Sequence, residues 1–319
     1  MERLSSTGNL QGTNESPHGS DTTQMVFGNL QPAVDADLTD TPHGWVAELD
    51  LGFRNQGNRT LMYRRRHRGP LLVQRPFYPP GDTACHVCLL HPPGGLVGGD
   101  RLRICADLSP GARVLLTSPA ATKVYRTPGN EVHQNVTLSV SDGAFLEWLP
   151  LESLFYDGAN AVFSTRIDLS GDATFLGWDI NCLGRPAAGE RFRRGRVRMH
   201  TEIRRDGDPL WIDRGEFRGL DDSDFLDAPY GLQGNPVTGT VVACAVEWNV
   251  PQIVDRLRAR LNGTCRAGRI AISGLDSVIV CRYLGDGTRA ALETFRELRA
   301  VLRPALIGAK AVDSRLWNT

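Results

Sequence analysis

The sequence has no net charge, because 36 Lys and Arg residues balance 36 Asp and Glu residues. A general nucleic-acid-binding protein usually carries a strong basic excess, so this balance argues against that class. A chain of near-zero net charge also tends to associate, which mildly favours a protein that works with an obligate partner.

Long apolar runs and a regular cysteine framework are also missing. No run approaches the roughly 20 apolar residues that a membrane helix needs, and no basic-then-apolar signal segment opens the chain. The seven cysteines are odd in number and irregular in spacing. The run Cys85-His86-Val87-Cys88 is half of a zinc site without a second half. We therefore expect a cytoplasmic protein with reduced, buried thiols.

Familiar catalytic motifs are absent as well. The sequence contains no G-x-S-x-G elbow, no H-E-x-x-H helix, no P-loop and no G-x-G-x-x-G turn. We therefore expect no nucleotide site in this chain. Because catalytic groups can be assembled in space from distant residues, a β-fold metal-dependent hydrolase built around His91 and Asp100 is kept as an alternative.

The chain divides into two parts by composition. Residues 1–42 are rich in Ser, Thr, Gly, Asn, Gln and Asp and poor in large apolar residues, which predicts a disordered N-terminal extension. Residues 43–319 are expected to form a single domain, which is long enough to bury a substantial core.

The body of this domain is predicted to be mostly β. Between about residues 44 and 248, short β-branched or alternating runs such as 112–117, 132–140 and 197–203 are separated by Gly, Pro, Asn and Asp. Because no helices intervene, a doubly wound parallel sheet is excluded, and a β-helix-like (solenoid) body, a distorted sandwich or a barrel is favoured over it. No fixed-period repeat is visible.

Two helices are expected late in the chain. Ile253, Leu257 and Leu261 recur at helical spacing, and a second helix is predicted from Thr288 to Arg303. Pro304 is expected to end or kink that helix. A strand is predicted between them, over residues 277–283.

The stretch 91–100 (HPPGGLVGGD) is the most distinctive candidate site. Its glycines, Gly94, Gly95, Gly98 and Gly99, are expected to shape a tight loop with polar ends. Asp100 is either a carboxylate ligand for a divalent metal or a cap that accepts backbone N–H groups of the loop. His91 is either a transient metal contact or a hydrogen-bonding group that locks the loop.

Two glutamates are further candidates. Strand alternation places Glu147 with Phe145 and Leu149 on an otherwise apolar face. A buried ion pair with an arginine such as Arg126 or Arg185 is the alternative to a metal role there. For Glu190, which precedes a basic run, a surface salt bridge is the alternative.

The chain also contains two basic runs and one acidic run. Residues 64–68 (RRRHR) and 191–198 (RFRRGRVR) could bind nucleic acid with Phe192 as a stacking side chain. A solvated strand face, or a patch that meets an acidic partner, is the favoured interpretation. Residues 221–224 (DDSD) predict an exposed acidic loop.

Several ordered blocks together resemble the urease accessory protein D family (UreD, also called UreH). The blocks are residues 69–79 (GPLLVQRPFYP), 91–100 (HPPGGLVGGD), 117–126 (TSPAATKVYR), 146–150 (LEWLP), 183–190 (LGRPAAGE) and 315–319 (RLWNT). The resemblance covers the chain from about residue 45 to its end. Two features depart from the family pattern: the N-terminal extension, and Cys88 at a position where an aromatic residue is common.

The resemblance implies a non-catalytic scaffold of the cytoplasm. Members of this family bind apo-urease and recruit a helical F protein and, through it, a GTPase, the G protein, so that nickel reaches the urease active site. The family fold is a β-helix-like body with two helices, and an internal channel lined by polar residues is proposed to carry the nickel. No tightly bound cofactor, nucleic acid or membrane is implied, and a homodimer within the accessory complex is an alternative to a single copy.

On this basis we expect Asp100, Glu147 and Glu190 along a nickel route, with His91 at its entrance. Partner docking is expected at the late helices and at the end of the chain, Arg315, Leu316 and Trp317. The indole of Trp317 is either packed into the core or an interface anchor.

Overall fold

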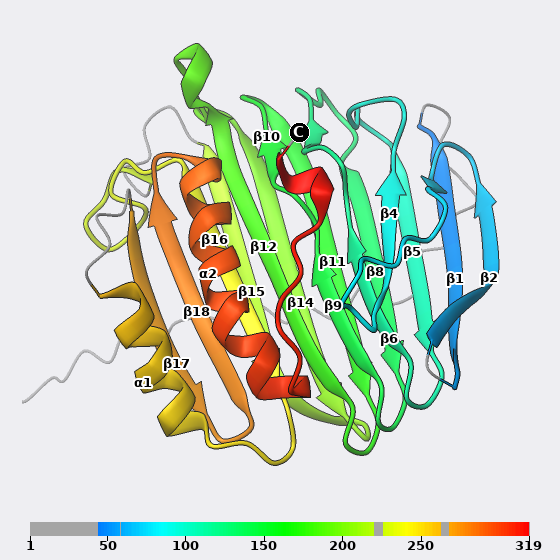
Figure 1. Ribbon diagram of the computed structural model, residues 1–319. Coiled ribbons are helices and arrows are strands. Elements are labelled where there is room, and N and C mark those ends of the chain that lie inside the picture. Colours follow the sequence, from blue (N-terminus) through cyan, green and yellow to red (C-terminus); the bar gives the residue numbers. More distant parts are fainter. Residues whose placement is uncertain (1–43, 58, 220–225, 263–267, 319) are drawn as a thin grey trace, which may run out of the picture. The chain divides into compact units, whose positions relative to one another are not determined.

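Two facing β-sheets and two helices make up the part of the chain that the computed structural model describes, residues 44–57, 59–219, 226–262 and 268–318 (Figure 1). In spatial order, sheet one contains β15 (Asp208–Gly219), β14 (Gly195–Arg205), β11 (Ala159–Leu169), β8 (Val132–Val140), β5 (Arg101–Leu108), β1 (Val46–Gln56) and β2 (Arg59–Arg68). The main path of sheet two contains β17 (Arg269–Leu275), β18 (Val278–Gly285), β16 (Val237–Cys244), β12 (Thr174–Arg185), β9 (Phe145–Leu149), β6 (Arg113–Thr117), β4 (Cys85–Leu90) and β3 (Leu72–Val73). The short strands β7 (Thr122–Val124), β10 (Ser153–Phe155) and β13 (Glu190–Arg191) join sheet two at its side. The predicted extension, residues 1–42, lies outside the described residues.

Successive strands alternate between the sheets, so the chain winds in stacked coils. It passes from β4 to β5, β6, β8, β9, β11, β12 and β14, changing sheet at each step apart from the short side strands. Within each sheet, strands of neighbouring coils pair in parallel, as β5 does with β8 and β6 with β9. The prediction of a mostly β, β-helix-like body with two helices near the C-terminus is confirmed.

The coils share a turn whose recurrence was not expected from the sequence. Residues 109–112 (SPGA), 141–144 (SDGA) and 170–173 (SGDA) each link a strand of sheet one to the next strand of sheet two. In each turn the alanine N–H donates to the serine carbonyl at 3.0–3.1 Å. The glycine takes a left-handed φ, for example +68° at Gly111, which side chains rarely adopt. Because the copies are unevenly spaced along the chain, they do not register as a fixed-period repeat.

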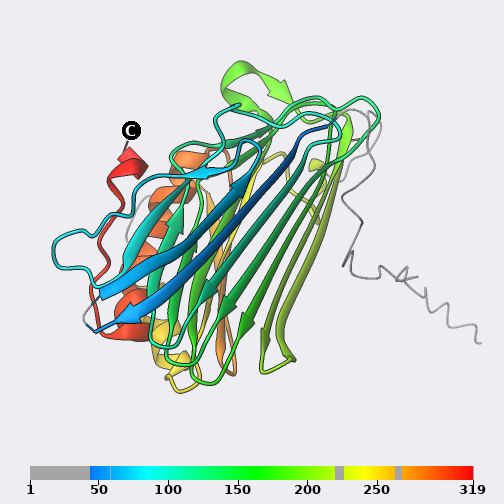
Figure 2. The same ribbon diagram turned by 90° about the vertical axis from the view of Figure 1, so that its right-hand side faces the viewer.

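The protein has two apolar cores, one on each side of sheet two. The first lies between the sheets and includes Leu49, Leu138 and Leu146. The second lies between sheet two and helices α1 (Val250–Leu261) and α2 (Thr288–Ile307), and it includes Phe295 and Trp317. Figure 2 shows α2 on one side of the sheets and the strands of sheet one on the other. None of the helices in the described residues is long and apolar enough to cross a membrane.

Helix α2 continues past Pro304 to Ile307, so the prediction that the helix ends at Pro304 is wrong. Proline removes one intrahelical hydrogen bond and its ring crowds the preceding turn, but here it lies in the last turn, where only three helical residues follow it. The turn after it packs Ala305, Leu306 and Ile307 against the second core. Gly308, with φ of 68°, ends the helix and donates its N–H to the Pro304 carbonyl.

Candidate functional site

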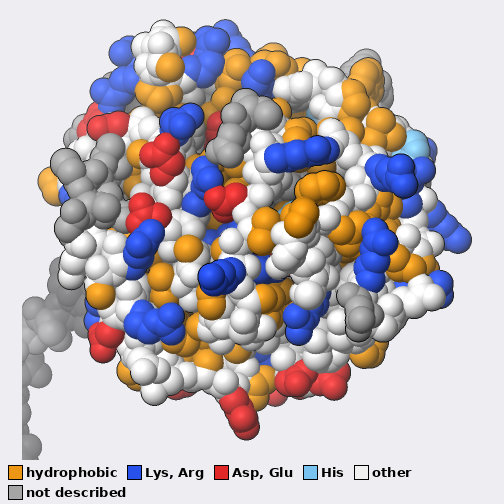
Figure 3. All heavy atoms as spheres, in the orientation of Figure 1, with side chains coloured by type: hydrophobic (Ala, Val, Ile, Leu, Met, Phe, Trp, Pro, Cys, Tyr) orange, Lys and Arg blue, Asp and Glu red, His pale blue; other side chains and the backbone are white. Residues whose placement is uncertain are grey.

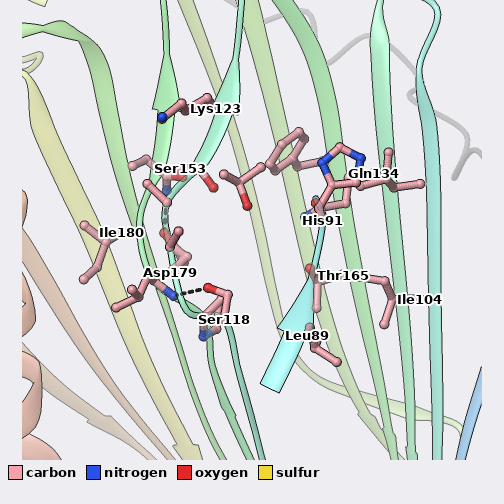
Figure 4. A pocket seen from close by; sticks show the side chains of 18 of the residues that line it. Leu89, His91, Ile104, Ser118, Lys123, Gln134, Ser153, Thr165, Asp179 and Ile180 are labelled. Carbon is pink, nitrogen blue, oxygen red and sulfur yellow. Dashed lines mark hydrogen bonds between the residues drawn. The ribbon is translucent and has the colours of Figure 1, made fainter. Parts of the chain in front are cut away.

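A cavity of about 400 Å³ lies between the two sheets. Its walls are apolar in large part, with Leu102, Ile104 and Trp148 among the lining residues. The polar lining residues are His91, Ser118, Thr122, Lys123, Gln134, Ser153, Thr165, Asp179, Asn181, His200 and Thr201. Figure 4 shows His91, Gln134 and Thr165 on one side of this space, opposite Ser153 and Asp179. An apolar space with a few convergent polar groups is the usual form of a binding site.

Strand alternation explains why polar groups meet here. On β11, Thr165 takes an inward position in the same series as the core residues Phe163 and Ile167. The register pairs Thr165 with Thr201 of β14, and Thr201 with Asp213 of β15. The inner face of sheet one therefore carries a polar row that runs toward the β15 edge.

Sheet two carries a matching row on its inner face. The register pairs Asp179 of β12 with Thr240 of β16, and Thr240 with Arg282 of β18. Asn181 Nδ2 donates to Asp179 Oδ1 at 2.6 Å. Arg282 Nη1 donates to Asp213 Oδ2 at 2.6 Å and so joins the two rows.

Asp179 is the carboxyl group on the cavity wall. Its burial and the nearby carboxylate of Asp213 raise the pKa of Asp179 to about 7, although the charge of Arg282 and hydrogen bonds from Asn181 and Thr240 act in the opposite direction. This group therefore changes its charge near neutral pH, and it can accept or release a proton as a cation comes and goes.

The glycine loop forms one end of the cavity wall. His91, Gly94 and Gly95 line the cavity. A Cβ at Gly95 would collide with the ring of Tyr125, and Gly99 has φ of +92°. Burial lowers the pKa of His91 against the opposing effect of the Asp100 charge, so its imidazole is held in the neutral form that can coordinate a metal.

Asp100 holds the loop rather than lining the cavity. The carboxylate is buried, and its two oxygens accept the backbone N–H groups of Trp45 and Val97, each at 2.9 Å. The structure thus shows the capping arrangement that the sequence left open for Asp100. A metal contact by Asp100 stays a prediction, and it would compete with these two hydrogen bonds.

Glu147 points to the opposite side of sheet two, toward α2. Its Oε1 accepts Arg299 Nε at 2.6 Å and its Oε2 accepts Arg303 Nε at 3.0 Å, with all three side chains fully buried. The partners expected from the sequence, Arg126 and Arg185, were wrong, because Glu147 faces α2, whereas Arg126 lies after β7 and Arg185 ends β12 and pairs with Glu190.

Arg303 extends this buried network to a second carboxylate. Its Nη2 donates to Asp82 Oδ1 at 2.5 Å, and the other Asp82 oxygen lies 2.9 Å from His86 Nε2. Although burial acts in the opposite direction, these hydrogen bonds, the Ala84 N–H and the Arg303 charge hold the pKa of Asp82 well below its usual range. The network pairs two buried arginines with two buried carboxylates and is therefore charge-balanced.

Glu190 lies apart from the inter-sheet cavity. Its Oε2 accepts Arg185 Nη2 at 2.6 Å, and its Oε1 accepts the backbone N–H of Asp157. The Arg185 guanidinium lowers the pKa of Glu190.

Of the four candidates for the nickel route, His91 lines the inter-sheet cavity, and Asp100, Glu147 and Glu190 are engaged elsewhere. Within the described residues, no group of three or more His, Cys, Asp or Glu side chains could hold a metal ion.

Comparisons of the sequence with known proteins show the family of this chain. The model of the family described as UreD urease accessory protein matches residues 46–318. The chain therefore belongs to the UreD urease accessory protein family. It is 44% identical over 275 residues to the urease accessory protein UreD of Dechloromonas aromatica, covering 86% of this chain and 95% of that protein. The UreD of Azoarcus sp. (45% over 281 residues; 86% and 95%) and that of Nitrosococcus oceani (42% over 288 residues; 90% and 94%) are similar to it as well.

The end of the chain is packed into the second core. Trp317 is 6% exposed, its Nε1 donates to Thr117 Oγ1 at 2.9 Å, and its ring lies 5.2 Å from that of Trp178. The indole of Trp317 is therefore packed into the core, which was one of the two alternatives expected from the sequence. Docking of a partner at Arg315 and Leu316 stays a prediction.

The second basic run is largely neutralised within the protein. Its ion pairs are Arg191–Asp227, Arg194–Asp157, Arg196–Glu216 and Arg198–Glu131. Phe192 is 3% exposed, so the base-stacking role considered for it is excluded in this conformation. On the helix side, basic and acidic side chains are interspersed (Figure 3). The predicted acidic loop, residues 221–224, lies outside the described residues.

Asp179 was missed at the level of sequence, although a signal for it exists. Asp179 and Asn181 alternate with Trp178, Ile180 and Cys182 in the buried strand β12. Asp179, like Glu147, is a carboxylate on an apolar strand, where an unpaired charge is costly. The ion pair of Asp213 with Arg282, in contrast, depends on how β15 and β18 face each other, which the sequence does not show.

Proposed function

We propose that this chain is the scaffold on which nickel is inserted into urease. In this proposal it binds apo-urease and recruits the F accessory protein and, through it, the GTPase G protein. Membership of the UreD urease accessory protein family is the observation that carries the maturation role. The absence of a P-loop from the sequence agrees with GTP hydrolysis by a partner. The protein itself performs no catalysis and holds no resident cofactor.

Nickel is the cargo in this proposal, and the inter-sheet cavity is its passage. The walls offer hydroxyl, amide and carboxyl groups together with the neutral His91 imidazole. Oxygen and imidazole donors suit Ni²⁺, and a sparse set of them binds it weakly. Weak binding is what a passage needs, because the ion must leave as readily as it enters.

The buried network around Glu147 has a structural role in this account. Its carboxylate is saturated by two arginines, and it faces away from the cavity. Asp100 likewise acts on the route indirectly, because it fixes the loop that carries His91.

Reconstitution tests the maturation role directly. Apo-urease is incubated with Ni²⁺, GTP, and the F and G proteins, with and without the full-length chain, and urease activity is measured. We expect full activation only when the chain is present and a stable complex with the F protein on gel filtration. Equal activation in its absence would contradict the proposed function.

A further inference from the structure

The polar rows of the two sheets meet at an ion pair beside the cavity. Thr201 and Asp179 line the cavity. Asp213 lies one strand further toward the β15 edge than Thr201, and Arg282 lies two strands from Asp179 in the same direction. The Arg282–Asp213 ion pair therefore connects sheet two to sheet one on the outer side of Asp179.

Arg282 is held there by several groups at once. Its Nη1 donates to Asp213 Oδ2 at 2.6 Å and to Thr240 Oγ1 at 3.1 Å. Its guanidinium carbon also lies 5.6 Å from the ring centre of Trp211. The guanidinium thus lies between the sheets at the point where the polar row of sheet one reaches its edge strand, β15.

The exposure of this pair differs sharply from that of the Glu147 network. The Arg282 and Asp213 side chains are 48% and 31% exposed, whereas those of Glu147, Arg299 and Arg303 are 0% exposed. An ion pair in contact with water exchanges its partner for solvent at little cost, but a fully buried one does not. The Arg282–Asp213 pair can therefore open without disturbing the core.

We propose that Arg282 is a gate residue that controls the movement of a hydrated divalent cation between solvent and the inter-sheet cavity at the β15–β18 end. With the guanidinium in place, its positive charge and its bulk oppose a cation in this opening, as an arginine does in a selective pore. When Arg282 swings into solvent, the carboxylates of Asp213 and Asp179 are left to attract the cation. The gate rests on the proposed function, because it assigns one end of the same nickel passage.

Fluorine NMR of the full-length protein labelled with 5-fluorotryptophan tests the gate. Trp148 lines the cavity, whereas Trp248 packs against the second core and serves as the reference signal. Paramagnetic Ni²⁺ that enters the cavity broadens the Trp148 resonance even when it binds weakly. In Arg282→Gln we expect half-broadening of Trp148 at a Ni²⁺ concentration about fivefold lower than in the wild type.

Three further variants sharpen the comparison. Arg282→Lys keeps the charge and should titrate like the wild type. Asp213→Asn releases Arg282 but also removes one carboxylate that attracts the cation, so its shift should be smaller than that of Arg282→Gln. Asp168→Asn removes the carboxylate of an ion pair with Arg166 elsewhere on sheet one and should leave the titration unchanged. Metal-free spectra with the wild-type dispersion show that each variant is folded.

The outcomes separate the gate from the passage. If Arg282→Gln and the wild type broaden Trp148 at the same Ni²⁺ concentration, the cavity is a passage but Arg282 is not its gate. If Trp148 is broadened in neither protein beyond Trp248, both the gate and the nickel passage are wrong. Urease activation in the reconstituted system would still support the scaffold role in that case.

Discussion

Replacing Glu147 by alanine should destabilise the fold more than replacing any of the other predicted site carboxylates. The substitution leaves Arg299 and Arg303 buried, with 0% exposed side chains, and removes the carboxylate that both of them contact. Arg303 keeps Asp82, and Arg299 keeps the carbonyl of Val312 and a 3.4 Å contact with the 40% exposed Asp313, but Arg299 loses its short contact with a buried carboxylate. Breaking a buried pair of this kind costs about 3–5 kcal/mol.

Urea unfolding followed by circular dichroism measures this free energy. Glu190→Gln is the matched control, since the Glu190 side chain is 24% exposed and its pair with the solvent-exposed Arg185 should contribute little to stability. The double variant Glu147→Leu with Arg299→Met replaces one ion pair by apolar groups and leaves Arg303 with Asp82, so it should recover much of the loss. A free energy of unfolding for Glu147→Ala within about 1 kcal/mol of the wild type would refute the buried-network argument.

Three other substitutions give independent tests. Asp100→Asn leaves one of the N–H groups of Trp45 and Val97 without its acceptor, so we expect a loss of about 1.5–3 kcal/mol in urea unfolding, and an unchanged stability would contradict the capping role. Asp179→Asn should stabilise the protein at pH 8 but not at pH 4. A pKa of about 7 means that folded Asp179 holds its proton more tightly than unfolded Asp179, so the wild type loses stability as the pH rises from about 4 to 7. Equal melting temperatures of variant and wild type across this range would refute this. Trp317→Ala removes a buried indole and should cost about 3–5 kcal/mol, and a loss below about 1 kcal/mol would show that the end of the chain is not part of the core.

Much of the fold could be predicted from local patterns in the chain. Short alternating runs predicted strands, and Ile253, Leu257 and Leu261 predicted helix α1, because burial of one face produces those periods. The coil repeat was not visible, since it resides in four-residue turns such as 141–144 and in loops of unequal length. The end of α2 was misjudged because Pro304 was weighed without Ala305–Ile307, whose packing extends the helix.

The candidate site was harder to predict, because its polar groups come from distant strands. The sequence correctly suggested that Glu147 lies on an apolar face, but the arginines that pair with it belong to α2, more than 150 positions away. The pairing of Asp213 with Arg282 depends on how two sheets face each other, and no local pattern encodes that arrangement. The family resemblance indicated a role in urease maturation, whereas the geometry showed which of the expected residues reach the cavity.

Nickel loading of urease through a blocked cavity tests the central claim most directly. Thr165→Phe places a ring in the inter-sheet space, and Thr137→Phe, on the exposed outer face of β8, is the matched control. Each protein is added to apo-urease with the F and G proteins, GTP and Ni²⁺, and the nickel content of the isolated urease is measured. The account predicts that Thr165→Phe binds apo-urease normally but loads no more nickel than a mixture without the chain, whereas Thr137→Phe loads as the wild type does. Full loading by Thr165→Phe would contradict passage of nickel between the sheets.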